Sequence, residues 1–112
     1  MNYQYYFGHH FQKQLKPYLK KYRSLAKDIR FALKTFDPRL SIWLGGRAYK
    51  IRVKSQDISR GKSHAFRMIV LLIELNNILA PVTLYFKGNR ENITNKEIAY
   101  HTSMVEHELI GL

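Results

Sequence analysis

Several residue types and patterns are rare or missing in this chain of 112 residues. It has no cysteine, which excludes disulfide bonds, thiolate zinc sites and cysteine nucleophiles. Acidic residues are few, with 8 Asp and Glu against 19 Lys and Arg. No stretch approaches the roughly 18 uninterrupted apolar residues of a membrane-spanning helix, and the N-terminus lacks the pattern of a signal peptide. We therefore expect a cytoplasmic chain with no membrane partner.

The residues that are present predict one domain over residues 1–112. Apolar residues make up 46% of the chain, enough for a single core, and no repeat or linker divides it. The formal net charge of +11 favours nucleic acid or an acidic protein as partner and opposes self-association.

The first third of the chain is expected to form a short strand and two helices. Residues 3–7 are rich in aromatic residues, which favours a strand. Apolar residues then recur at threes and fours over residues 8–22, with Pro17 inside the pattern, which predicts a kink or a break into two shorter helices. A second helix is expected from an N-cap at Ser24 to about residue 36, with Asp28 on its outer surface.

Pro38 ends the second helix, because a residue before proline disfavours helical geometry. Residues 39–48 are expected to form a connecting loop with Trp43 or Leu44 as a buried anchor. Gly45-Gly46 would then make a turn into the next strand.

Three antiparallel strands are predicted next. Residues 49–54 alternate between apolar and cationic side chains, which is typical of a half-buried strand. Residues 66–75 are almost continuously apolar and favour a central strand buried on both faces. Asn76-Asn77 is suited to a two-residue turn. In the third strand Val82, Leu84 and Phe86 would point inward, and Pro81 indicates an edge position or a bulge.

The last element is expected to be a helix that begins at Thr94, because Thr94 and Glu97 have the spacing of a capping box. Ile98, Met104 or Val105, and Leu109 would pack inward. The predicted fold class is therefore α+β: an N-terminal helical hairpin on a small twisted antiparallel sheet, then a C-terminal helix, with the helices on one face.

A basic trough is predicted on the opposite face of the sheet, where the outward residues of three strands converge. The strands would contribute Lys50, Arg52, Lys54, Arg67, Thr83, Tyr85 and Lys87; the loop would add Arg60, Lys62, Ser63 and His64 at one end, and Arg90 would close the other. Such a surface can bind a phosphodiester backbone, and it can also cleave one. A solvated sheet face is the plain structural alternative for these cations, as is a half-buried strand residue for Tyr85.

RNA cleavage by attack of the 2′-hydroxyl on the adjacent phosphate needs a base, an acid and a group that stabilises the negative charge on the phosphorane. Arginine stays protonated and serves as the stabiliser. A lysine crowded by other cations can act as a base, because the neighbouring charges lower its pKa. Tyr85 can orient the 2′-hydroxyl or transfer a proton. His64 would either take part in this reaction or only fill space in the loop.

No cofactor or metal motif is visible. Gly61-Lys62-Ser63 lacks the upstream glycine and the following helix of a P-loop. The histidines at 9, 10, 101 and 107 are poorly spaced for one metal site and lack clustered carboxylate or thiol partners. We therefore expect no metal and no cofactor.

The motifs YKIRVKS, RGKSHAFRMIVLLIE, TLYFKGNRENIT and NKEI follow the hairpin FQKQLKPYLKKYRSLAKDI in an order that resembles the RelE/ParE superfamily of bacterial type II toxins. The resemblance spans most of the chain. It implies a RelE-like fold, similar to a microbial ribonuclease without the usual carboxylate–histidine pair. It also implies metal-independent mRNA cleavage in the ribosomal A site and neutralisation by an acidic cognate antitoxin.

By position, the resemblance makes Arg52, Lys54, Arg67, Tyr85 and Lys87 the catalytic candidates. The residues expected to contact mRNA or 16S ribosomal RNA are Lys50, Arg60, Lys62, Ser63, His64, Arg90 and the helical lysines Lys13, Lys16, Lys20 and Lys21. The loop departs from relatives, which often carry two glycines where this chain has His64 and Ala65, so its turn should be stiffer.

Two other functions are compatible with the same fold. A ParE-like toxin would inhibit DNA gyrase by protein contact and would need no catalytic residues. A non-catalytic relative would bind nucleic acid without toxicity. The set of cations and Tyr85 favours the ribosome-dependent endoribonuclease.

Overall fold

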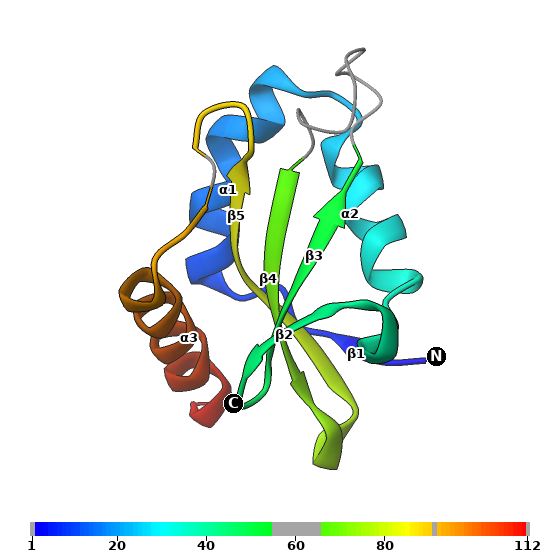
Figure 1. Cartoon of the computed structure of the whole chain (residues 1–112), viewed down its shortest axis with the longest axis vertical. Helices are drawn as coiled ribbons and strands as arrows, with labels where there is room; N and C mark the ends of the chain where they lie inside the picture. Colours follow the sequence, from blue (N-terminus) through cyan, green and yellow to red (C-terminus); the bar gives the residue numbers. More distant parts are fainter. Residues whose placement is uncertain (1, 55–65, 91, 112) are drawn as a thin grey trace.

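The structure is a computed structural model that describes residues 2–54, 66–90 and 92–111. In these residues a five-stranded mixed sheet carries helices on both faces (Figure 1). The elements are β1 (Gln4–Tyr5), α1 (His9–Lys21), α2 (Leu25–Lys34), the 3₁₀ helix η1 (Pro38–Leu40), β2 (Ile42–Gly45), β3 (Ala48–Val53), β4 (Phe66–Ile73), the 3₁₀ helix η3 (Glu74–Asn76), β5 (Ile78–Phe86) and α3 (Asn95–Ile110).

The strand order is β1-β5-β4-β3-β2. The predicted antiparallel strands β3, β4 and β5 are confirmed, but β1 runs parallel to β5, so the sheet is mixed. The prediction of a loop over residues 39–48 is wrong, because β2 lies there and pairs with β3. Trp43 is exposed rather than a buried anchor, whereas Leu44 packs against the core. Gly45 and Gly46 close the hairpin with φ of 102° and 53°, values that favour glycine.

Helices α1 and α2 cover one face of the sheet. Their apolar stripes, which include Phe11, Leu15, Ile29 and Leu33, join the inward residues of β3, β4 and β5 in one core cluster. The predicted break at Pro17 does not occur, since α1 runs unbroken from His9 to Lys21. Proline removes one backbone donor on the solvent side, and burial of the opposite side holds the helix together.

Asp28 was expected on the outer surface of α2, and that prediction is wrong. Its side chain is buried and accepts a hydrogen bond of 2.8 Å from the hydroxyl of Ser24, the N-cap residue. A buried carboxylate needs such polar partners, and the four-residue spacing places the hydroxyl within reach.

Helix α3 packs on the face opposite α1 and α2, so the helices do not all lie on one face. Val105 is fully buried against Ile69, Leu71 and Val82 of the sheet. The reason is the two-sided apolar character of β4, which requires cover on each face. The capping box at the start of α3 is confirmed: the Thr94 hydroxyl accepts from the Glu97 N–H at 3.1 Å, and the Glu97 carboxylate accepts from the Thr94 N–H at 3.1 Å.

Strand β5 contains a bulge at Val82. Ile69 pairs with Thr83 and Val70 with Pro81, which leaves Val82 as the extra residue. Val82 therefore packs on the α3 face, whereas Leu84 packs on the α1–α2 face, contrary to the predicted shared direction. The turn before β5 is also longer than two residues, because η3 precedes Asn77, which has a φ of 55°.

Candidate nucleic-acid interface

Three residues on neighbouring strands form a cross-strand row. Arg52 of β3 pairs with Arg67 of β4, and Arg67 pairs with Tyr85 of β5. Paired residues of antiparallel strands lie on the same face, so the three side chains are direct neighbours. We call this set the Arg-Arg-Tyr row.

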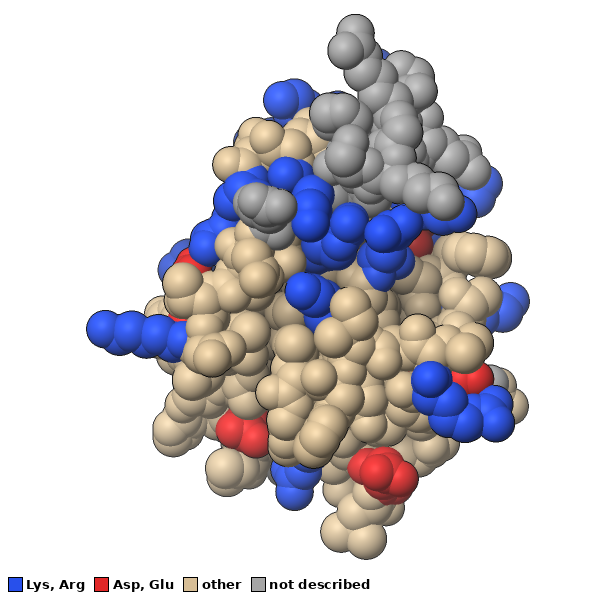
Figure 2. All heavy atoms as spheres, in the orientation of Figure 1, with Lys and Arg blue, Asp and Glu red and all other residues tan. Residues whose placement is uncertain are grey.

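Further cations extend the row at the same end of the sheet. Lys54 directly follows β3 and is exposed, and Lys87 directly follows β5 and is half-buried. Lys50 lies two residues before Arg52 along β3. Figure 2 shows Lys and Arg in a band across the upper part of the molecule, where β3 and β5 end and β4 begins in Figure 1.

An aromatic cluster supports the row from the other face of the sheet. Phe66 and Phe86, each next to a residue of the row, have ring centroids 5.2 Å apart. Tyr18 and Tyr22 of the α1 end each lie 5.2 Å from the Phe66 centroid, with nearly perpendicular rings. These contacts fix the backbone that carries Arg67 and Tyr85.

The electrostatics of the row favour an anionic ligand. Partial burial, together with the charge of Arg52, lowers the pKa of Arg67 from its ordinary value, although an arginine still remains a cation. Like charges directly opposite each other in a sheet are destabilising. The placement of Arg52 beside Arg67 therefore opposes folding and suits the binding of a phosphate between them.

Tyr85 is buried rather than outward in an open trough, with 4% of its surface exposed. Its hydroxyl has no hydrogen-bond partner within the described residues. Burial raises the pKa of Tyr85, and the charges of Arg67 and Arg90 oppose that shift. A buried hydroxyl without a partner is a costly feature that a ligand can relieve.

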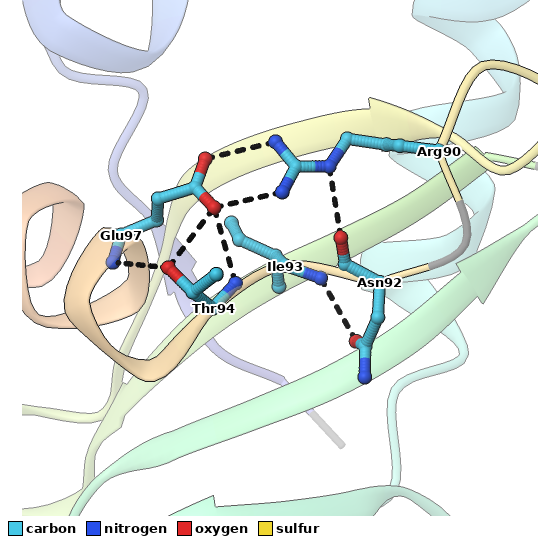
Figure 3. A network of polar contacts seen from close by, with 5 residues as sticks. All are labelled: Arg90, Asn92, Ile93, Thr94 and Glu97. Atoms are coloured by element: carbon cyan, nitrogen blue, oxygen red, sulfur yellow. Dashed lines mark hydrogen bonds and ion pairs between the residues drawn. The ribbon is translucent and has the colours of Figure 1, made fainter.

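Arg90 is held beside Tyr85 by a polar network at the start of α3 (Figure 3). Its Nη2 and Nη1 lie 2.7 and 2.8 Å from the two carboxylate oxygens of Glu97, and its Nε donates to the Asn92 carbonyl at 2.8 Å. The guanidinium carbon is 5.9 Å from the centroid of the Tyr85 ring. These bonds, with those from Thr94, lower the pKa of Glu97 to about 2, so its carboxylate stays charged.

Sequence reasoning missed the role of Glu97 in this network. The capping-box spacing identified Glu97 as a partner of Thr94, but nothing in the local pattern pairs it with Arg90. The ion pair also means that Arg90, predicted to contact RNA, is already engaged by a carboxylate.

Other predicted residues lie away from the row. Thr83 is buried and donates to the Gln14 side chain at 2.6 Å, so it does not line an open trough. The exposed lysines of α1 (Lys13, Lys16, Lys20 and Lys21) belong to the helix that covers the other face of the sheet. The predicted residues Arg60, Lys62, Ser63 and His64 lie outside the described part of the chain.

Two histidines that are distant in sequence meet between α1 and α3. His10 Nε2 and His101 Nδ1 are 2.7 Å apart, and Glu108 accepts from the His10 backbone N–H at 2.8 Å. Burial lowers the pKa of both histidines. Within the described ranges, no three His, Asp or Glu side chains gather around one possible metal position.

The described helices include none with the length and apolar character required to cross a membrane. In sequence, the chain matches no family model and no curated protein. Its fold is similar to that of a solved structure of the E. coli toxin RelE in the free state, in which two arginines are replaced by alanine. The TM-score is 0.52 at 14% identity, and the likeness covers 81% of this chain and 90% of that chain. The chain therefore has a RelE-like α+β fold.

Proposed function

We propose that this chain is the toxin of a type II toxin–antitoxin system and cleaves mRNA on the ribosome. The observation that carries the proposal is the Arg-Arg-Tyr row, in which two cations and a buried hydroxyl meet on three adjacent strands of a RelE-like sheet. A phosphate seated on the row would receive charge-assisted hydrogen bonds from Arg52 and Arg67.

In the proposed reaction, the 2′-hydroxyl oxygen attacks the adjacent phosphorus and the bond to the 5′-oxygen breaks. Arg52 and Arg67 stabilise the extra negative charge on the phosphorane. Tyr85 keeps its proton near neutral pH, because burial raises its pKa, and can donate a hydrogen bond to a reacting oxygen. Lys54 and Lys87 flank the row and are the candidates for taking the 2′-proton and supplying one to the leaving oxygen.

The ribosome has a physical role in this proposal. The row offers charge and a hydroxyl but neither an imidazole nor a carboxylate, so the chemistry depends strongly on alignment of the 2′-hydroxyl with the leaving oxygen. Holding mRNA in that geometry can supply several kcal/mol of the barrier. Activity on free RNA is therefore expected to be weak.

The antitoxin would be an acidic protein that docks between α1 and α2. A groove of about 660 Å³ lies there, with Leu15, Leu19 and Ile29 among its apolar lining. Lys13, Lys16 and Arg30 also line it. An amphipathic segment with acidic flanks fits this combination of apolar surface and positive charge.

Cleavage in a translating extract tests the proposal. The wild type should cut translated mRNA within codons, and Arg67→Ala should lower the rate by about 10²–10³-fold. Arg47→Ala is the matched control, because Arg47 is an exposed arginine on the β2–β3 turn. Intact mRNA and unimpaired translation with the wild type would refute the proposal. Inhibition of gyrase supercoiling by that protein would instead support a ParE-like toxin.

A further inference from the structure

A pocket adjoins the Arg-Arg-Tyr row where the sheet edge opens. Strand β2 pairs with β3 only as far as Ile42 opposite Lys50, so β3 from Ile51 onward has no β2 partner. A cavity of about 320 Å³ lies between this open edge and the segment that connects α2 to β2. It is lined by residues of α2, β2, β3, β4 and that segment, namely Ala32, Thr35, Phe36, Asp37, Leu40, Ser41, Ile42, Lys50, Ile51, Arg52 and Arg67.

One wall of the pocket belongs to the row itself. Arg52 and Arg67 line the pocket, and both are members of the row. Lys50 adds a third cation to the same wall. A phosphate bound by the two arginines would therefore sit beside the pocket, and the rest of its nucleotide would be within reach of it.

The open edge also supplies main-chain groups. The Leu72 N–H donates to the Arg47 carbonyl, so these two residues form a hydrogen-bonded pair across the two strands. Along antiparallel strands every second pair is hydrogen-bonded, and in the register of β3 and β4 the Arg52–Arg67 pair is one of those that are not. This alternation directs the N–H and C=O of Arg52 away from β4 and toward the open edge. Such groups can recognise the polar edge of a base.

The pocket also presents apolar surface to solvent. Leu40 is 86% exposed and Ile42 is 58% exposed, and both line the pocket. Two hydroxyl groups also line the pocket: the Ser41 hydroxyl donates to the Asp37 carbonyl at 2.8 Å, and the Thr35 hydroxyl donates to the Phe31 carbonyl at 2.8 Å. Both hydroxyl oxygens retain lone pairs that can accept from a ligand.

Size and chemistry together indicate the class of ligand. The volume lies at the lower end of the range of about 300–1,000 Å³ that is typical of small-molecule sites. A nucleobase has flat apolar faces and a polar edge, and proteins commonly hold unstacked RNA bases against apolar side chains or arginine planes. The aliphatic side chains and arginines that line this pocket match that chemistry.

We propose that this pocket is a nucleobase subsite, which holds the base next to the phosphate bound by Arg52 and Arg67. Leu40 and Ile42 would contact the apolar surface of the base, and the Arg52 guanidinium would lie beside it. The proposal rests on the proposed function in that it takes single-stranded RNA as the ligand. It adds that the toxin itself, and not the ribosome alone, contacts a base at the cleavage site.

Titration calorimetry with a 2′-O-methyl trinucleotide tests the subsite, because the blocked 2′-oxygen prevents cleavage. A set of three further probes carries an abasic sugar at one position each and keeps the same phosphates. Removal of the base that occupies the pocket should weaken binding about 5- to 150-fold. The double variant Leu40→Ser/Ile42→Ser should bind the intact probe as weakly as that abasic probe.

The matched control is Leu75→Ser/Ile110→Ser. Leu75 is 95% exposed and Ile110 is 81% exposed, and neither lines the pocket. This control should bind all probes as the wild type does, and both double variants should keep the wild-type melting temperature within a few degrees.

The outcomes separate the subsite from the nuclease. If intact and abasic probes bind equally well, only the phosphates are recognised and the subsite is overturned, while the proposed function stands. If the Leu40→Ser/Ile42→Ser variant retains the preference for the intact probe, the pocket is not where the base binds. If no probe binds the wild type at all, the subsite and direct RNA recognition by the row are refuted together. A preserved base preference without mRNA cleavage in extract would support the subsite and refute the nuclease.

Discussion

Replacing Tyr85 by phenylalanine should stabilise the fold and impair the proposed activity. The hydroxyl of Tyr85 is buried and has no hydrogen-bond partner among the described residues. Tyr85→Phe removes this hydroxyl and keeps the ring, which packs with Ile69, Val82 and Val105 on the α3 side of the sheet and lies beside the Arg90 guanidinium. The substitution therefore isolates one polar atom from the packing around it.

The magnitude follows from the cost of the unpaired group. Leaving a buried polar group without a partner costs about 1–3 kcal/mol. The nearby cations Arg67 and Arg90 partly compensate the hydroxyl oxygen, so we expect the lower end, a gain of about 1 kcal/mol in the free energy of unfolding. For a domain of this size, that gain corresponds to about 4 °C in melting temperature. Loss of the hydroxyl should lower cleavage by about 10²-fold or more.

Urea denaturation and thermal melting of Tyr85→Phe, with mRNA cleavage measured on the same preparations, provide the test. Tyr100→Phe is the control, because Tyr100 is exposed and lies on α3 away from the row, and both of its readouts should stay near wild type. A loss of 1 kcal/mol or more in Tyr85→Phe would refute the reasoning, since it would mean that the hydroxyl stabilises the folded protein. Increased stability with full activity would leave the hydroxyl without a role in cleavage.

Two further predictions concern charged groups. Glu97→Gln, which retains the capping-box spacing, should change the free energy of unfolding only slightly, because the ion pair is exposed to solvent. It should lower cleavage more than Glu106→Gln does, because it frees Arg90 from its place beside Tyr85; equal activity of the two variants would contradict this. Burial lowers the pKa of His10 and His101 below the ordinary 6.5, so the unfolded chain takes up protons first on acidification. The free energy of unfolding should therefore fall as the pH drops below about 6.5, and a His101→Gln variant should show a shallower fall in urea titrations. Identical slopes would rule out the pair as the source.

Local patterns determined much of the fold. The alternation in β3, the continuous apolar run of β4 and the Thr94–Glu97 capping box each concern residues close together in the chain, and each predicted its element correctly. Strand β2 was missed because Ile42, Trp43 and Leu44 are consecutive apolar residues before a glycine pair, so the segment lacks the alternation that predicts a half-buried strand.

Tertiary structure alone decided how distant residues meet. The contact of His10 with His101 spans 91 residues, and that of Gln14 with Thr83 spans 69. The bulge at Val82 reversed the side-chain directions expected from simple alternation, because register depends on the partner strand.

The sequence by itself determined that this protein is a strongly basic α+β domain whose cations follow particular strands, because charge and periodicity are properties of neighbouring residues. Only the tertiary structure decided that Arg52, Arg67 and Tyr85 form one row, since that depends on strand register. It also decided that Tyr85 is buried and that α3 covers part of the same face, because burial depends on what packs above a strand.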